Sequence, residues 1–284
     1  MSDFHSFALA HGLQIDKLHP CERVQRCPTT DKPRSKNGAW FWDGLRGWVS
    51  DWAQGGDIHW FDGGEKKAFT EAERKAWAQR KQATEQRQAE GWGRAAMAAS
   101  LLLRDSEVKE HNYLHSKGLG QLTGLVGESS DLLVPMRNVI DNTLQGVQVI
   151  RWLPEERTYE KKMLPGMRAK GAVMRIGPKQ AQETIFCEGY ATGLSIELAV
   201  RQMRLSAAVL VCFSDSGMVN VAPMVKGRKY CFADNDKSGA GHRAAEKMGV
   251  PFVMSDTEGF DANDEHHKRG LMAVCQLLMK VRRM

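Results

Sequence analysis

The chain has 284 residues, of which 42% are hydrophobic and 26% charged, a composition that is typical of folded globular proteins and excludes wholesale disorder. Forty Lys and Arg against 34 Asp and Glu give a net charge of +6, which favours an anionic partner. No apolar run reaches the ~20 residues of a membrane helix, and no signal-peptide pattern begins the sequence. We therefore expect a cytoplasmic protein of about two domains that does not bind membranes.

Residues 1–64 are rich in tryptophan and glycine and predict a small β-rich module. Within it, residues 39–52 hold two short apolar strands around an Asp-Gly turn, which is typical of a β-hairpin. Basic residues surround the tryptophans, so Trp40, Trp42, Trp48 and Trp52 are candidates for stacking on the bases of a single-stranded DNA template. The alternative is that most tryptophans form the core, because a domain of this size needs large side chains to bury enough area.

The next two segments predict a helical linker and a basic subdomain. Residues 65–117 are rich in Ala, Glu, Lys, Arg and Gln, and they predict a long helix followed by a short helical stretch from Glu107 to Lys117. Residues 118–180 alternate short apolar runs with turns, which predicts a small mixed α+β subdomain with antiparallel strands. Between 151 and 175, seven Lys and Arg stand against three Glu, a local charge of +4 that favours phosphate binding.

Residues 181–284 alternate strands with helices. Apolar strands are predicted at 184–187, 207–213, 229–233 and 250–254, and helices at 193–204, 240–248 and 266–283. Thr192 is the expected N-cap of the first of these helices. Continuous apolar strands that alternate with helices predict a parallel sheet covered on both faces, so the expected fold class is α/β.

Acidic residues follow three of these strands. They are Glu188 after the first strand, Asp234 and Asp236 after the third, and Asp256, Asp261 and Asp264 after the fourth, with Asn263 between the last two. Because ligands bind at the carboxyl ends of the strands in such a sheet, the side chains are predicted to crowd one edge. Crowded carboxylates repel one another, and Mg²⁺ or Mn²⁺ would relieve that repulsion. The alternative is a set of ordinary turns, in which Asp, Asn and Gly are common.

Several of these motifs resemble the Toprim domain shared by primases, topoisomerases and some nucleases. The segments EGYATGLSI and ADNDKSGAGHRAAEK each include a strand end, and FDANDEHHKRGL follows them. With HNYLHSKGL and RWLPEERTYEKKMLPGMRAKGAVMRIG upstream, residues 110–270 look closest to the Toprim primases of phages, satellite elements and conjugative plasmids. Residues 1–64 are more loosely similar to the N-terminal module of the same primases.

The resemblance implies a Toprim-like catalytic domain over 181–284, preceded by the basic subdomain of a primase core over 118–180. It implies Glu188, Asp234 and Asp236 at the catalytic centre, with Glu188 as general base or metal ligand, and a second metal ion at Asp261 with Asn263 or Asp264. Two such ions activate an attacking 3′-hydroxyl and neutralise the leaving pyrophosphate. The basic residues expected to bind nucleotide or DNA are Arg137, Lys162, Lys170, Lys237, His242 and Arg243.

The implied function is that of a DNA primase, a DNA-directed RNA polymerase that joins NTPs into a short RNA primer on single-stranded DNA with Mg²⁺ or Mn²⁺. Two alternatives stay open: a Toprim nuclease that hydrolyses phosphodiesters, and a non-catalytic nucleic-acid-binding replication factor. The sequence has no P-loop, so we expect a separate replicative helicase as partner in a bacterial host cell. Zinc is not expected, because its candidate ligands lack the paired spacing of a zinc site: His11, His19, Cys21, Cys27 and His59.

Overall fold

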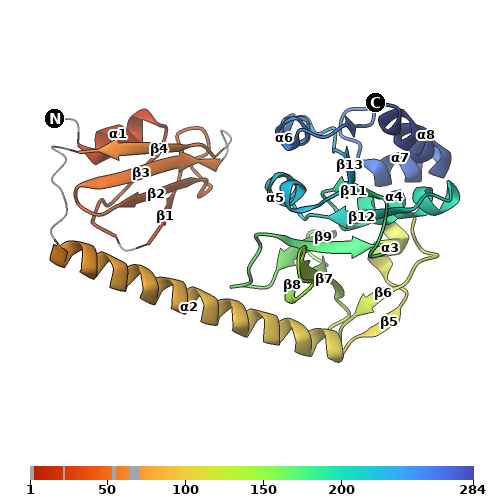
Figure 1. Ribbon diagram of the computed structural model, residues 1–284, viewed down its shortest axis with the longest axis horizontal. Coiled ribbons are helices and arrows are strands. Elements are labelled where there is room, and N and C mark those ends of the chain that lie inside the picture. Colours follow the sequence, from red (N-terminus) through yellow and green to blue (C-terminus); the bar gives the residue numbers. More distant parts are fainter. Residues whose placement is uncertain (1–2, 22, 53–55, 64–70) are drawn as a thin grey trace. The chain divides into compact units, whose positions relative to one another are not determined.

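The chain divides into two compact units, Met1–Gln79 and Arg80–Met284, in a computed structural model (Figure 1). The residues that the structure describes are 3–21, 23–52, 56–63 and 71–284. Within them, no helix is both long enough and apolar enough to cross a bilayer. The first unit holds an antiparallel sheet, and the second is an α/β fold with a mixed sheet flanked by helices.

The first unit is a four-stranded antiparallel sheet with one helix packed against it. Its elements are α1 (Phe4–Ala10), β1 (Gln25–Cys27), β2 (Gly38–Trp42), β3 (Arg46–Asp51) and β4 (Ile58–Asp62), with the strands in sequence order. The predicted hairpin is confirmed as β2 and β3, in which Trp40 pairs with Val49. Phe4 of α1 is buried against these two residues. One face of the sheet is thus covered by α1, as alternation along each strand requires.

Helix α2 runs from Glu71 to Arg104 in one piece. Its many Ala, Glu, Lys, Arg and Gln residues have high helix propensity, which explains the length. The helix does more than link, because its part from Arg80 onward belongs to the second unit and buries Ala99 in a cluster with Leu133 of the sheet.

The stretch after α2 differs from the helix expected over 107–117. Glu107–Lys109 is strand β5, which pairs antiparallel with β6 (Gly124–Val126), and only Asn112–Ser116 is helical, as α3. The imidazole of His111 caps α3 by accepting the N–H of Tyr113 (3.0 Å). The helical prediction is therefore wrong at its start, because strand pairing overrides local propensity there.

The second unit is built on a ten-stranded sheet in the order β14-β13-β11-β12-β10-β7-β6-β5, with β8 beside β7 and β9 beside β8. The parallel strands are β11 (Glu183–Cys187), β12 (Ala207–Val211), β13 (Arg228–Phe232) and β14 (Phe252–Val253). The antiparallel part holds β7 (Leu132–Asn138), β8 (Leu144–Leu153), β9 (Thr158–Met163) and β10 (Ala172–Ile176). Because β10 pairs antiparallel with both β12 and β7, the two predicted sheets are one continuous sheet.

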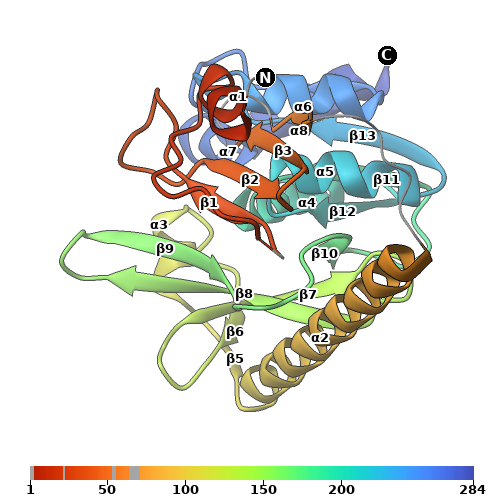
Figure 2. The same cartoon turned by 90° about the vertical axis from the view of Figure 1, so that its left-hand side faces the viewer.

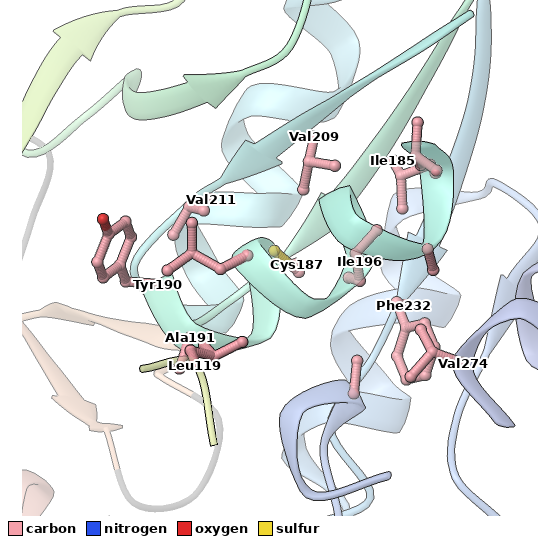
Figure 3. Packing of buried hydrophobic residues seen from close by; sticks show 14 of the residues in the cluster. Leu119, Ile185, Cys187, Tyr190, Ala191, Ile196, Val209, Val211, Phe232 and Val274 are labelled. Carbon is pink, nitrogen blue, oxygen red and sulfur yellow. The ribbon is translucent and has the colours of Figure 1, made fainter. Parts of the chain in front are cut away.

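Helices cover both faces of the parallel strands, as predicted (Figures 1 and 2). One face carries α4 (Tyr190–Gln202), α7 (Ala262–Arg269) and α8 (Leu271–Arg282), and the other carries α5 (Asp215–Val221) and α6 (Ala240–Met248). Figure 3 shows Ile196 of α4 and Val274 of α8 packed with strand residues such as Ile185, Val209 and Phe232. Burial of this apolar layer fixes the strand ends where the acidic residues lie.

Two predictions at helix ends are wrong. Gly189 is the N-cap of α4, and Thr192 instead donates its hydroxyl to Oδ2 of Asp261 (2.7 Å). The helix predicted over 266–283 is two helices, because Gly270 separates α7 from α8 with a φ of 86°. That backbone conformation strongly favours glycine.

Candidate active site

Four carboxylates come to one edge of the second unit's sheet. Glu188 follows β11, Asp215 follows β12, Asp234 follows β13, and Asp261 lies between β14 and α7. Asp234 lies within electrostatic range of the other three and of Asp236. The carboxyl ends of neighbouring parallel strands share one edge, so the topology itself brings these groups together.

The carboxyl groups of Glu188 and Asp215 lie close enough for each to shift the pKa of the other. Burial and the charge of Asp215 raise the pKa of Glu188 to about 7, and burial and the charge of Asp236 raise the pKa of Asp215. A proton on one of the two carboxyl groups would relieve their repulsion. Oδ1 of Asp215 is buried and has no hydrogen-bond partner within the described part of the chain. The pair therefore keeps an oxygen free for a further ligand.

The turn after β12 is shaped to bring Asp215 to Glu188. Phe213 has a φ of 63°, and its N–H donates to the carbonyl of Glu188 (2.9 Å). A bulky residue costs about 1 kcal/mol or more in this conformation, so the surrounding structure must enforce it. Ser214 then caps α5 by accepting the N–H of Gly217 (3.0 Å), and a Cβ at Gly217 would collide with a carbonyl oxygen of the strand end. The backbone is thus constrained both before and after Asp215.

Asp234 lies at the centre of the cluster and is largely buried. Burial, followed by the charges of Asp261 and Glu188, raises the pKa of Asp234 to about 8. Its Oδ1 is buried and makes no hydrogen bond to any residue that the structure describes. Helix α6 approaches so closely that a Cβ at Gly241 would collide with the Asp234 carbonyl. An acid in such a place is stabilised either by a proton or by a cation.

Asp236 belongs to the same loop as Asp234, but both of its carboxylate oxygens accept hydrogen bonds. Its Oδ1 accepts the N–H of Ser238 (2.8 Å), and its Oδ2 accepts the N–H of Gly241 (2.9 Å). Burial alone would raise the pKa of Asp236, but these hydrogen bonds outweigh it and lower that pKa to about 2. Asp236 is therefore a fixed anion that anchors the start of α6.

Asp261 is held at the N-terminus of α7. Its Oδ1 accepts the N–H of Asp264 (2.8 Å), and Asp264 accepts the N–H of Asp261 in return (3.2 Å), which forms a capping box. Asn263 is buried, and its amide donates to the carbonyl of Lys117 (2.9 Å) and to Ser195. Asn263 therefore ties α7 to the loop after α3, and its amide is committed to that contact.

The donor set of the cluster consists of carboxylate oxygens, which are the ligands that hard divalent cations prefer. Asp215 and Asp234 each keep a buried oxygen without a hydrogen bond, so the residues fit Mg²⁺ or Mn²⁺. Among the described residues, no three His, Cys, Asp or Glu side chains already lie in a metal-binding arrangement. An ion would therefore have to draw Glu188, Asp215 and Asp234 together from their present positions.

Two adjacent lysines of β9 lie on opposite faces of the strand. Lys162, the lysine implied by the resemblance, is 72% exposed and forms an ion pair with Glu160 (2.6 Å). Nζ of Lys161 lies 5.4 Å from the ring centre of Tyr113, and its charge opposes the upward pKa shift of Glu188. The structure therefore brings Lys161, and not its neighbour, to the acidic cluster.

Arg243 is a predicted basic residue whose charge also reaches the cluster. It lowers the pKa of Asp215 against the effect of burial, and its guanidinium donates to the carbonyl of Ser238 (2.8 Å). The other predicted nucleotide-binding residues lie on the surface: Arg137 donates to the carbonyl of Asn142, Lys237 faces Glu258 (4.0 Å), His242 faces Glu246 (3.5 Å), and Lys170 is exposed ahead of β10.

The tryptophans of the first unit divide by sheet face. Trp40 is 3% exposed, so the prediction that it stacks on template bases is wrong: its ring lies in the core. The ring of Trp42 stacks on Phe4, with centroids 5.8 Å apart and planes at 12°. Trp48 lies on the other face, half-buried and directly opposite Trp60 of β4 in the strand register.

Two exposed tryptophans are the better placed candidates for base stacking: Trp52, which is among the predicted residues, and Trp60, which is not. Trp60 is 73% exposed and Trp52 is 63% exposed. The guanidinium of Arg26 lies 3.7 Å from the ring centre of Trp52, in a cation–π contact. The sheet face that is turned away from α1 therefore combines exposed rings with a cation.

Sequence reasoning missed Asp215, Lys161 and Trp60. Asp215 follows the apolar strand 207–213 just as Glu188 follows its own strand, so the same strand-end rule could have found it. For Lys161 and Trp60, the signal is the side on which a strand residue points, which depends on the pairing partners.

No protein-family model and no curated protein matches the chain. A solved structure of the bacteriophage T7 lagging-strand DNA polymerase, interacting with primase domains of two gp4 subunits bound to an RNA/DNA hybrid and dTTP, is similar with a TM-score of 0.41 and 12% identity. The similarity covers 62% of this chain and 91% of the matched chain. A likeness of that extent says nothing about catalysis, so the function has to be inferred from the side chains themselves.

Proposed function

We propose that the protein is a DNA primase that joins NTPs into a short RNA primer on single-stranded DNA. The observation that carries this proposal is the buried Oδ1 of Asp234, which has no partner among the described residues and is surrounded by the carboxylates of Glu188, Asp215 and Asp261. Such a set would hold a divalent cation, and Lys161 and Arg243 add positive charge beside it. Cations on both sides of a phosphate are what phosphoryl-transfer sites supply.

When bound, Mg²⁺ or Mn²⁺ would activate the attacking 3′-hydroxyl and neutralise the negative charge of the leaving pyrophosphate. In the reaction, the 3′-oxygen forms a bond to the α-phosphorus, and the bond from that phosphorus to the β-phosphate oxygen breaks. In its ionised form Glu188, whose pKa is raised to about 7, would accept the proton of the hydroxyl. Lys161 would bind the phosphates, and Asp236 would hold the loop in place.

The first unit would contribute the template-binding surface of this primase. Its outer sheet face offers Trp48, Trp60 and the Arg26–Trp52 pair, and rings beside cations bind single-stranded DNA with little sequence preference. Residues 23–46 hold six Lys and Arg against two Asp, a local charge of +4 that suits a phosphate backbone. Unwinding of the duplex would fall to a separate helicase.

Primer synthesis on single-stranded DNA tests this function. Purified full-length protein receives random-sequence template, four NTPs of which one is labelled, and Mg²⁺ or Mn²⁺. The wild type should make labelled oligoribonucleotides, and Asp234→Asn should lower the yield by about 1,000-fold. The matched control is Asp256→Asn, an exposed aspartate that follows β14, which should leave the yield unchanged.

Two outcomes would contradict the proposal. Cleavage of the template without primer synthesis would establish the nuclease alternative. DNA binding with neither synthesis nor cleavage, with the helicase supplied, would establish a non-catalytic role.

A further inference from the structure

A groove of about 490 Å³ lies in the second unit, outside the acidic cluster. One side comes from the segment that joins β5 to α3, and the other comes from the hairpin of β8 and β9, which Figure 2 shows beside α3. The lining residues that matter here are Lys109, Glu110, His111, Asn112, Trp152 and Tyr159. Nothing in the chemistry proposed above uses this groove.

Aromatic rings form one wall of the groove. Trp152 of β8 and Tyr159 of β9 are cross-strand partners, and their ring centroids lie 4.8 Å apart. Trp152 is 45% exposed, whereas Tyr159 is half-buried and packs edge-on against buried Tyr113 (5.2 Å, 76°). A large ring that is half exposed and braced by a second ring offers a flat surface to another planar ring.

The opposite wall is held rigid by hydrogen bonds. Nδ1 of His111 accepts the N–H of Tyr113 (3.0 Å), so this imidazole carries its proton on Nε2, which donates to the carbonyl of Ser130 (2.9 Å). The ring of His111 lies 6.2 Å from that of Tyr159. Both walls are therefore preformed, which lowers the entropic cost of binding.

One face of β9 carries a lysine between the groove and the acidic cluster. Tyr159 and Lys161 are two residues apart in the strand, so both side chains lie on the same face. Lys161 lies over the ring of Tyr113, and its charge reaches Glu188. The acidic cluster is therefore followed by Lys161 and then by Tyr159 along this face of β9, and Trp152 lies beside Tyr159 on β8. Residues 151–175, with seven Lys and Arg against three Glu, add a local charge of +4.

We infer that this groove binds an unpaired base of the single-stranded nucleic acid on which the acidic cluster acts, with the base stacked on Trp152, the ring of Tyr159 supporting Trp152, and an adjoining phosphate at Lys161. The protein presents a cation next to aromatic rings, and single-stranded nucleic acid presents a phosphate next to a planar base, so the two match. The inference rests on the proposed function, since it assigns the path of the nucleic acid at that same site.

Binding to two oligonucleotides tests the inference with the full chain. The probes are fluorescein-labelled oligo(dT) and an abasic oligonucleotide of equal length, which has the same phosphates and no bases. Trp152→Ala should weaken oligo(dT) binding about fivefold or more, which is the least that a stacked base contributes, and it should leave abasic binding unchanged. Trp152→Phe should retain most of the affinity. Met272→Ala, which removes another exposed apolar side chain of this unit, should have no effect.

Crosslinking locates the base independently of the first unit. Oligo(dT) with 5-iododeoxyuridine should crosslink to the peptide that holds Trp152 and Tyr159, and Trp152→Ala should abolish that crosslink. If Trp152→Ala binds and crosslinks like the wild type while primer synthesis proceeds, the inference is wrong and the proposed function stands. If the wild type neither primes nor binds oligo(dT), the proposed function fails and the inference fails with it.

Discussion

The two units place their candidate functional residues in different parts of a β-sheet. In the second unit, Glu188, Asp215 and Asp234 lie just beyond strand ends, where the order of parallel strands alone brings them together. In the first unit, the candidate rings lie within strands, where the side of the sheet decides whether Trp40 is core or Trp60 is surface. Residues at strand ends can therefore be located from topology, whereas residues within strands require the pairing register.

The largest expected effect separates the two faces of the first unit's sheet. Trp40→Ala should lower the free energy of unfolding by about 3–5 kcal/mol, because it leaves a cavity in the core around Phe4. Trp60→Ala should change that free energy by less than about 0.5 kcal/mol, since its ring is 73% exposed. Urea denaturation measures both values. Equal destabilisation by the two substitutions would contradict the assignment of faces.

Trp60→Ala should also weaken single-stranded DNA binding by about fivefold or more, through loss of base stacking. Fluorescence anisotropy with a labelled oligonucleotide measures this change. Unchanged binding would show that the outer face of the sheet does not bind the template.

An effect smaller than that of Trp40→Ala distinguishes the two faces of β9. Lys161→Ala should lower kcat/KM for primer synthesis by about 30-fold, through loss of a cation beside the reacting phosphates. Lys162→Ala is the matched control and should cost less than about threefold, because its partner Glu160 lies on the far side of the strand from the cluster. Steady-state kinetics with varied NTP measure both values. A larger loss for Lys162→Ala than for Lys161→Ala would reverse the assignment.

The smallest expected effect is on stability and depends on pH. Burial raises the pKa of Asp234 from 3.8 to about 8, so the folded state keeps a proton that the unfolded state has lost. The folded protein therefore loses stability as the pH rises from about 4 to 8 in the absence of metal. Asn cannot ionise, so Asp234→Asn should be more stable than the wild type at pH 8 in EDTA, by about 1 kcal/mol or more, and similar near pH 4.

Thermal unfolding across this pH range, with and without Mg²⁺, measures the effect. Added Mg²⁺ should stabilise the wild type at pH 8 and not the variant. A variant that is less stable than the wild type at pH 8 in EDTA would show that Asp234 carries no such penalty.

Much of the fold follows from the sequence, and the exceptions have physical causes. The alternation of apolar strands and helices after residue 181 predicts the α/β class and the covering of both faces. The strand at Glu107–Lys109 is missed because it exists only through pairing with β6. The end of α7 is missed because Gly270 interrupts a pattern whose apolar period continues across it.

The candidate site shows the same limit. Glu188, Asp234 and Asp261 can be predicted from strand ends, but the hydrogen bonds that commit Asp236 to the start of α6 and Asn263 to the loop after α3 depend on tertiary contacts. The groove at Trp152 and Tyr159 also depends on the register of β8 and β9. A sequence pattern alone predicts neither these hydrogen bonds nor the groove.

Calorimetric titration of Mn²⁺ into the metal-free protein tests the central claim, that the strand ends of the second unit form a site for a divalent cation. Wild type and the Asp256→Asn control should bind Mn²⁺ with equal affinity, and Asp234→Asn should bind at least about tenfold more weakly. Equal binding by wild type and Asp234→Asn would contradict the claim, as would a wild type that binds no Mn²⁺.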